Sequence, residues 1–356
     1  MEMRRDDFSK KTAIVLILSL LLILCAGCEE IKDFPRNKQA TDDRTELVTS
    51  DVPEEAEIKG SGDESVYLEA PAGSGERVSE TKEEDADANS EADTDYAALS
   101  TDKTITIYDI EDGYMEVPYY SELPQCEYDW SYLKLDGQIL HYDDPAYETT
   151  LGIDVSKFQG DIDWDKIKGQ GFDFVMIRLG YRGYGSGGLV TDERFEKNIR
   201  GAQEAGLETG VYFLSQALNE EEAVEEAEYT LKELKRCAIK PVTYPVVVDS
   251  EKIKFDVSRT ESMNGAERTD TILAFHKVIT DAGYDCALYA NSQWLTKDLD
   301  IRRLTDVDIW YADYQIFDND EAPLYPYPFI MWQYTNKGKA DGIDGDTDIN
   351  IFFRKK

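Results

Sequence analysis

Histidine and cysteine are both scarce in this chain of 356 residues. There are two histidines, His141 and His276, and five cysteines, and neither type forms the close pairs that hold zinc. We therefore predict no metal site and no cofactor, since structural zinc sites use clustered Cys and His ligands. Past the N-terminal segment three cysteines remain, Cys126, Cys237 and Cys286. An odd number does not describe a disulfide framework, so we expect buried thiols with at most one bridge.

Positive charge is also scarce. The chain carries 38 Lys and Arg against 74 Asp and Glu, a net charge of −36. A protein that binds phosphate backbones needs a basic surface, so nucleic acid is excluded as a partner. Residues 29–100 hold 22 acidic and 7 basic residues, a balance of 7 − 22 = −15, with almost no aromatic residues. Such a segment cannot offset its ordering entropy by burying apolar area, and we predict a disordered acidic linker over residues 29–100.

Long apolar runs are missing except near the N-terminus. The run 13–25 follows four basic residues and is too short to span a bilayer comfortably. Its end, Leu24-Cys25-Ala26-Gly27-Cys28, resembles a bacterial lipobox, in which Cys28 is lipidated, although Cys25 stands where leucine is usual. We predict a signal peptide over residues 1–28, with an uncleaved anchor as the alternative. Either way the remainder lies outside the cytoplasmic membrane and is tethered to it, and we expect a monomer.

Residues 101–150 are rich in tyrosine and contain strand-like pieces. Such surfaces can bind sugars, but tyrosine in strands more often packs against neighbouring elements. We predict a β-like extension over residues 101–150 that packs on the main domain.

Residues 151–356 alternate short apolar runs with helical segments. The predicted helices cover 192–205, 220–236 and 264–282, and the predicted strands are 151–155, 174–179, 209–214, 244–248, 286–289, 308–312, 329–332 and 347–352. Eight strands separated by helices indicate an α/β fold, an irregular (β/α)8-like TIM barrel. The segment after Tyr311 is loop-like, so the irregularity is expected late in the barrel. In a barrel of this kind, function collects at the carboxyl ends of the strands.

Two carboxylates close one of these strands, in the motif Asp249-Ser250-Glu251 after a run of valines. Because strand side chains alternate between faces, both acids are expected to point the same way. Like charges raise the pKa of one partner, as general acid–base chemistry requires, although two solvated charges at an exposed strand end are the simpler alternative. Asp154 and Asp348 stand at the ends of the first and last strands, so the barrel would bring four carboxylates to one cavity.

Other polar positions have simpler interpretations. A lone acid at a strand end is usually solvated or caps the next helix, as we expect for Asp163 and Asp192. The loop 183–188 contains Gly-x-Gly-x-x-Gly, a pattern typical of dinucleotide binding. Here the helix is expected to begin only near residue 191, so the glycines do not lead into its first turn. We interpret the segment as a rim loop.

Several motifs together resemble the family 25 glycoside hydrolases, the Chalaropsis-type lysozymes. They are Gly-Ile-Asp-Val-Ser at 152–156, Gln-Gly-x-Ile-Asp-Trp at 159–164, Asp-x-Glu at 249–251, Trp-Gln-Tyr at 332–334 and Asp-x-Asn at 348–350. The resemblance runs from about residue 152 to 352. It implies cleavage of the β-1,4 bond between N-acetylmuramic acid and N-acetylglucosamine in peptidoglycan.

The resemblance also implies residue roles. Glu251 matches the general acid and Asp249 its partner carboxylate, whose charge is expected to keep the proton on Glu251; Asp154 and Asp348 match the other two acids of the cleft. Where many members have histidine, this chain has Phe213. The residues predicted to bind substrate are Tyr212, Arg178, Tyr289, Trp310, Trp332, Gln333 and Asn350. Two alternatives are a catalytically weak glycan-binding lipoprotein and another Asp-x-Glu hexosaminidase.

Overall fold

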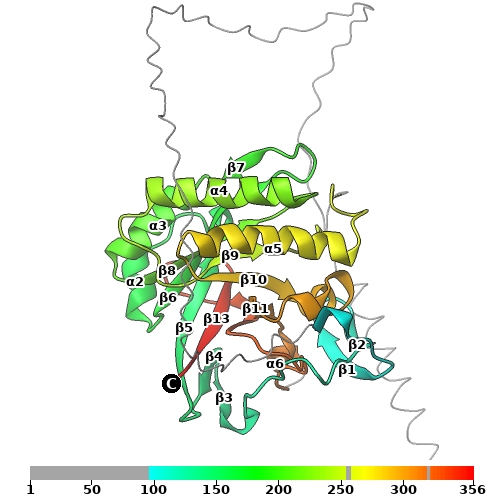
Figure 1. Ribbon diagram of the computed structural model, residues 1–356. Coiled ribbons are helices and arrows are strands. Elements are labelled where there is room, and N and C mark those ends of the chain that lie inside the picture. The colour runs from blue at the N-terminus through cyan, green and yellow to red at the C-terminus, as the bar shows by residue number, and fades with distance from the viewer. Residues whose placement is uncertain (1–95, 254–257, 319–320) are drawn as a thin grey trace, which may run out of the picture. The chain divides into compact units, whose positions relative to one another are not determined.

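A computed structural model describes residues 96–253, 258–318 and 321–356 (Figure 1). The predicted signal peptide, the lipidation site Cys28 and residues 29–95 of the predicted linker lie outside these residues, so the predictions about them stay predictions. Within the described part of the chain, no helix has the length and apolar character that a membrane crossing requires.

The centre of the fold is a sheet of nine strands, eight of which form a closed barrel-like sheet. Around the closed sheet the strands run in the order β5, β13, β12, β11, β10, β9, β8 and β6, and β6 returns to pair with β5. Their bounds are β5 Tyr147–Val155, β6 Phe174–Arg182, β8 Glu208–Leu214, β9 Val246–Asp249, β10 Cys286–Asn291, β11 Asp308–Ala312, β12 Met331–Gly338 and β13 Thr347–Lys355. The short strand β7, Leu189–Thr191, pairs with the end of β6. All eight predicted strands are present.

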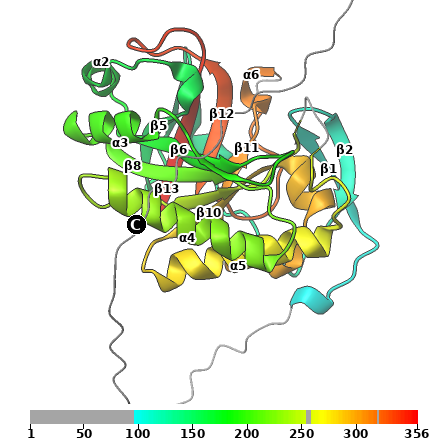
Figure 2. The same ribbon diagram turned by 90° about the horizontal axis from the view of Figure 1, so that it is seen from above.

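Helices cover only part of this sheet. Well-formed helices follow the first strands, and α4 and α5 lie side by side along one flank of the sheet (Figure 2). Their bounds are α2 Trp164–Gly169, α3 Phe195–Glu204, α4 Glu220–Cys237 and α5 Gly265–Asp281. After β10 the helical elements in the described parts of the connections are the short η4 Trp294–Asp298, η5 Ile301–Arg303 and α6 Gln315–Asp318. The ring of helices of a (β/α)8 barrel is therefore incomplete, which corrects the predicted architecture.

The late strands depart from the regular pattern for local reasons. Pro323, Pro326 and Pro328 crowd the connection before β12, and proline removes the N–H that a helix interior needs. Only eight residues, 339–346, join β12 to β13, too few for the crossover that parallel strands require. β13 therefore pairs antiparallel with both β12 and β5.

The segment before the barrel packs against it. It contains the hairpin of β1 Thr104–Asp109 with β2 Gly113–Pro118, the turn η2 Trp130–Tyr132, and the hairpin of β3 Leu133–Asp136 with β4 Ile139–Tyr142. The Tyr128 hydroxyl donates to the Phe329 carbonyl at 2.5 Å, and the Trp130 ring lies 6.0 Å from the Trp332 ring. Aromatic side chains from this extension therefore complete the core on the outer side of the sheet.

Aromatic and aliphatic side chains fill the lower interior of the barrel. Phe174 stacks on Tyr244 at 4.2 Å between ring centroids, and Met176, Val247 and Met331 complete this inner cluster. Gly152 allows the packing, because a Cβ there would lie 2.5 Å from the Phe174 ring. The inner cluster forms a floor below the carboxyl ends of the strands.

The three cysteines of the described residues are free thiols, whereas the cysteine count had left one bridge open. Cys237 and Cys286 are buried, Cys126 is half-buried, and none of the three is in a disulfide.

Candidate active site

The Asp249-Ser250-Glu251 segment leaves the barrel at the end of β9. Asp249 is the last residue of that strand, between Leu214 of β8 and Tyr289 of β10. Ser250 is held on two sides: its N–H donates to the Tyr289 carbonyl at 3.3 Å, and its Oγ accepts from Trp294 Nε1 at 2.9 Å. Glu251 thus follows the strand rather than ending it. It nevertheless lines the same cavity as Asp249.

A cavity of about 580 Å³ opens at the carboxyl ends of the strands, and the four predicted carboxylates line it. They come from four elements: Asp154 from β5, Asp249 from β9, Glu251 from the loop after β9, and Asp348 from β13. Five other predicted residues share the lining, namely Arg178, Tyr212, Tyr289, Trp310 and Gln333. Three more residues line it that the sequence analysis did not select, namely Leu214, Tyr314 and Asn336. We call this space the barrel-mouth cavity.

Two amide side chains hold Asp154 in place. Gln333 Nε2 and Asn350 Nδ2 both donate to Asp154 Oδ2, at 2.8 and 2.9 Å. The amide orientations are set from behind, because Asn350 Oδ1 accepts from Trp310 Nε1 at 2.8 Å and Gln333 Oε1 accepts from the Tyr289 hydroxyl at 2.9 Å. With each amide oxygen occupied by a donor, each NH₂ group is aimed at the carboxylate.

Burial raises the pKa of three acids of the cavity, Asp154, Asp249 and Asp348, and the charge of neighbouring carboxylates adds to the shift of Asp249 and Asp348. Burial raises the pKa of Asp154 to about 6, although the two amide hydrogen bonds oppose the shift. Burial, and then the charge of Asp154, raises the pKa of Asp348 to about 9. Asp348 lies directly across the strand pair from Asp154, so the two carboxylates cannot both ionise cheaply. The cavity can therefore hold protons at neutral pH.

Asp249 differs from its predicted state. Its pKa is raised well above the ordinary value, first by burial and then by the charge of Glu251, while Arg178 opposes the shift. One carboxylate oxygen, Asp249 Oδ1, is buried without a hydrogen-bond partner among the described residues. We predicted a charged Asp249 that keeps the proton on Glu251. The pKa of Asp249 is itself raised because it is the more deeply buried of the two.

Arg178 brings positive charge to the cavity. Its guanidinium pairs with the buried carboxylate of Asp192, with Nε and Nη2 at 2.8 and 2.7 Å from Oδ2. The same oxygen accepts from the Lys157 N–H at 3.1 Å. We expected Asp192 to be solvated or to cap a helix. It is buried, its Oδ1 accepts from the Arg194 N–H directly before α3 at 2.9 Å, and its Oδ2 orients Arg178; α3 begins later than predicted, at Phe195. Asp163 does cap a helix, since its carboxylate accepts from the Lys166 N–H at the start of α2.

Trp332 does not lie where a sugar could reach it. It is fully buried on the outer face of β12, and its Nε1 donates to the Asp313 carbonyl at 2.7 Å. Side chains alternate along a strand, so Gln333 takes the cavity face and Trp332 the opposite one. The prediction that Trp332 stacks on substrate is wrong. Asn350, also predicted to bind substrate, is fully buried behind Asp154 and acts on that carboxylate instead.

Two of the residues missed by the sequence analysis add polar groups. The Tyr314 hydroxyl donates to Gln333 Oε1 at 2.7 Å, beside the bond from Tyr289. Asn336 is an exposed residue of β12 at the rim of the cavity. Tyr314 comes two residues after the predicted strand 308–312, so its position after a strand end was the available signal. Nothing in the local sequence marks Asn336.

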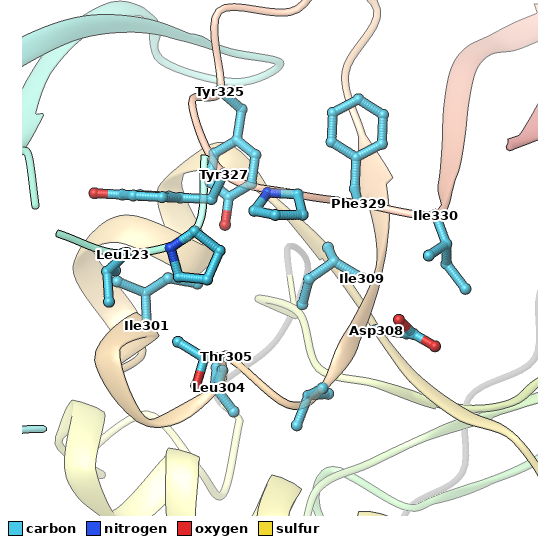
Figure 3. A pocket seen from close by; sticks show the side chains of 13 residues that line it. Leu123, Ile301, Leu304, Thr305, Asp308, Ile309, Tyr325, Tyr327, Phe329 and Ile330 are labelled. Carbon is cyan, nitrogen blue, oxygen red and sulfur yellow. The ribbon is translucent and has the colours of Figure 1, made fainter. Parts of the chain in front are cut away.

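A separate cavity of about 480 Å³ lies at the opposite end of β11 (Figure 3). Leu123, Ile309, Tyr325 and Phe329 give it a mainly apolar lining, with Asp308 at its edge. Asp308 is the first residue of β11, so this cavity lies at the amino end of the strand and away from the four carboxylates. It offers no acid pair for catalysis.

No group of three or more His, Cys, Asp and Glu side chains among residues 96–253, 258–318 and 321–356 is arranged to hold a metal ion. The four carboxylates come from β5, β9, the loop after β9 and β13, and the Gln333 and Asn350 amides hold Asp154.

Sequence comparison identifies related proteins. The model of the glycosyl hydrolases family 25 matches residues 153–343, more than half of the 356 residues. The autolytic lysozyme of Clostridium acetobutylicum is 24% identical over 201 residues, which cover 56% of this chain and 55% of that protein. Lysozyme M1 of Streptomyces globisporus is 26% identical over 207 residues, covering 56% of this chain and 67% of that protein. The chain thus matches about half the length of the first of these relatives.

Solved structures show the same fold. The modular autolysin LytC of Streptococcus pneumoniae, in complex with a synthetic peptidoglycan ligand, is 25% identical with a TM-score of 0.50, covering 58% of this chain and 47% of that chain. The spore cortex lytic enzyme SleM of Clostridium perfringens is 20% identical with a TM-score of 0.50, covering 60% and 69%.

Proposed function

This chain belongs to the family 25 glycosyl hydrolases, and on that premise we propose that it is a peptidoglycan hydrolase, cleaving the β-1,4 bond between N-acetylmuramic acid and N-acetylglucosamine. One observation carries the proposal: four carboxylates from separate elements meet in one cavity, beside tyrosines and one arginine. A binding module has no need to bury repelling acids, since their burial costs free energy.

Glu251 is the proton donor in this proposal. It lies on the half-exposed loop just after β9, with Ser250 held by Trp294, so its carboxyl group reaches the rim where a glycosidic oxygen would lie. As the C1–O bond breaks, the glycosidic oxygen takes the proton of Glu251, and water later supplies the hydroxyl at C1. Positive charge develops at C1 in the transition state, and the carboxylates beneath it stabilise that charge.

The three deeper acids have graded roles. Asp249 lies two residues before Glu251 in the chain and is buried at the end of β9, so it faces the reacting carbon from below. Asp154, with a pKa near 6 and two amide donors, is the acid of the group best able to carry charge at neutral pH. Asp348 keeps its proton at neutral pH and can donate a hydrogen bond to a sugar hydroxyl.

The decisive test uses the described fragment from Tyr96 onward with purified peptidoglycan. Release of new reducing ends is expected from the wild-type fragment, and Glu251→Gln is expected to lower the rate by about 10²–10⁴-fold, the usual contribution of a general acid. Glu261→Gln, an exposed acid ten residues later in the chain, is the matched control and is expected to retain full activity. Equal rates for Glu251→Gln and the wild type would remove Glu251 from the mechanism. Glycan binding without any reducing-end release would support the glycan-binding alternative.

We also propose that the catalytic part is tethered to the membrane through lipidated Cys28 and the acidic segment 29–95. A flexible chain of roughly 70 residues has a root-mean-square span of about 45 Å, and its net charge extends it further, so the barrel would reach the wall above the membrane. Replacing Cys28 with serine in the full chain is expected to move the protein from the membrane fraction to the soluble fraction. Unchanged membrane fractionation would contradict lipidation.

A further inference from the structure

A second cavity adjoins the barrel-mouth cavity and encloses about 860 Å³. The two share four lining residues, Glu251, Tyr289, Tyr314 and Asn336. Glu251 therefore lies at the junction of two spaces, each large enough for a sugar ring. We call the second space the hairpin cavity, because its outer wall is formed by the turn between β1 and β2.

The hairpin wall comes from outside the part of the chain that matches the family. Ile110 and Glu111 lie in the turn after β1 and line the hairpin cavity, whereas the family model begins at residue 153. In Figure 1 this hairpin lies beside the segment that follows β10. The wall is therefore an addition of this chain to the shared barrel.

One buried carboxylate fixes the turn on the barrel. Asp109 is fully buried; its Oδ2 accepts from the Gln293 N–H at 2.9 Å, which joins the hairpin to the loop after β10. Its Oδ1 accepts from the Glu111 and Asp112 N–H groups at 2.9 and 3.2 Å, which sets the shape of the turn. The cavity wall is therefore held in a defined position before any substrate arrives.

A second attachment lies on the other side of the hairpin. The Tyr114 hydroxyl and Gln315 Nε2 both donate to Glu321 Oε2 at 2.8 Å. Tyr114 belongs to β2 and Gln315 begins α6, so the hairpin is tied to the connections after β10 and after β11. Two attachments restrict the hairpin from rocking away from the cavity.

The position of the acids says which part of the substrate each space would take. Asp154, Asp249 and Asp348 line only the barrel-mouth cavity, and the sugar that gains positive charge belongs beside them. The proton donor must lie between that sugar and the leaving group. Since Glu251 stands at the junction, the leaving group falls in the hairpin cavity.

The lining of the hairpin cavity suits a sugar with amide and hydroxyl groups. Phe317 is 41% exposed and offers an aromatic face, and Ile110 adds apolar surface opposite the polar rim. Asn291 and Lys337 provide donors, and Glu111 provides an acceptor. Aromatic and apolar surface with convergent polar groups is the usual lining of a ligand site.

We propose that the β1–β2 hairpin forms one wall of a leaving-group subsite for an N-acetylated sugar, with Ile110 and Glu111 in contact with that sugar. The inference rests on the proposed glycosidase function. It adds to that function a chain-specific determinant of the sugar on the leaving side of the cleaved bond.

The test compares two substrates and one double variant of the fragment from Tyr96 onward. A peptidoglycan tetrasaccharide fills both cavities, whereas an aryl glycoside with the same non-reducing sugar places only a flat ring on the leaving side. The double variant Ile110→Ser with Glu111→Ala is expected to lose about tenfold or more in kcat/KM on the tetrasaccharide and to stay within twofold on the aryl glycoside. Asp112→Ala, the exposed neighbour in the same turn, is the control and is expected to match the wild type on both. Equal losses on both substrates, or none, would overturn the subsite.

A binding measurement separates this inference from the catalytic proposal. In the Glu251→Gln background, calorimetric titration with the tetrasaccharide is expected to show at least fivefold weaker binding for the double variant than for its parent. If the wild type binds the tetrasaccharide without cleaving it, the catalytic proposal fails, and weaker binding by the double variant would then support only the sugar contacts of Ile110 and Glu111. If the double variant binds as tightly as its parent, the subsite fails whatever the activity.

Discussion

Asp348 lies directly opposite Asp154 in the antiparallel pairing of β13 with β5, and both carboxylates enter the barrel-mouth cavity. Opposed acids on neighbouring strands are destabilising when both are charged. The pair therefore does not serve stability. Its cost in free energy of unfolding can be measured through the pH dependence of stability.

The first prediction concerns stability and pH. The folded pKa of Asp348 is about 9 against 3.8 for the ordinary group, so the folded state binds more protons than the unfolded state between these values. The free energy of unfolding therefore falls as pH rises through this window, and the contribution is complete only below about pH 4. Asp348→Asn is expected to flatten the fall in Tm between pH 5 and pH 8, by about 2–4 °C for each kcal/mol removed.

The control for this measurement is Asp344→Asn. Asp344 is an exposed acid of the connection 339–346 that precedes β13. It is expected to leave the pH dependence of Tm unchanged. Identical curves for Asp348→Asn and the wild type would show that Asp348 is charged in the folded protein at neutral pH.

The second prediction concerns the amide clamp on Asp154. Hydrogen bonds from Asn350 and Gln333 hold the pKa of Asp154 down against burial. Asn350→Ala removes one of them and is expected to move the pKa of Asp154 above about 6. Titration of labelled aspartate carboxyl carbons by NMR measures the change, and an unshifted or lowered pKa would contradict the clamp.

The third prediction separates two tryptophans. Trp332→Phe loses the buried hydrogen bond from Nε1 to the Asp313 carbonyl, so it is expected to cost about 0.5–1.5 kcal/mol of stability while KM stays unchanged. Trp310→Phe loses the bond to Asn350 Oδ1 and frees the amide that holds Asp154, so kcat is expected to fall. A raised KM with unaltered stability for Trp332→Phe would restore its predicted role in substrate binding.

The fourth prediction concerns the N-terminal extension. Trp130 packs against Trp332 and Phe329 but stays partly exposed, so Trp130→Ala is expected to cost about 2–4 kcal/mol, at or below the range for fully buried aromatics. Tyr132→Ala, at a residue that is 37% exposed in the same turn, is the control and is expected to cost much less. Chemical denaturation of both variants gives the comparison. Equal costs would mean that the extension packs only loosely on the barrel.

Much of the barrel could be predicted because its strands are buried on both faces and read as continuous apolar runs. The predicted strand 308–312 coincides with β11, and the predicted helix 220–236 differs from α4 by one residue. The late connections were harder to assign, since three prolines and a short glycine-containing turn replace helices there.

The acids of the site were predictable because each lies near the end of a strand, and a closed sheet gathers strand ends. The side of the sheet on which Trp332 lies was not predictable. Trp332 and Gln333 are adjacent, and a shift of one residue in the strand alternation exchanges their sides. The pKa of Asp249 depends on depth, which the spacing Asp-x-Glu does not contain. The approach of Ile110 to Glu251 joins residues far apart in the chain, so no local pattern could indicate it.

The packed floor of Phe174, Tyr244 and Met331 affects the route by which protons can reach the acids of the cavity. In the proposed mechanism Glu251 gives up a proton in every turnover and must regain one, while Asp154 and Asp348 lie above this packed cluster. The proton that restores Glu251 is therefore expected to enter through the mouth of the barrel, on the side that a bound glycan strand covers. Departure of the leaving sugar would then limit how soon Glu251 is protonated again. The β1–β2 hairpin that holds that sugar would therefore affect the turnover rate as well as substrate recognition.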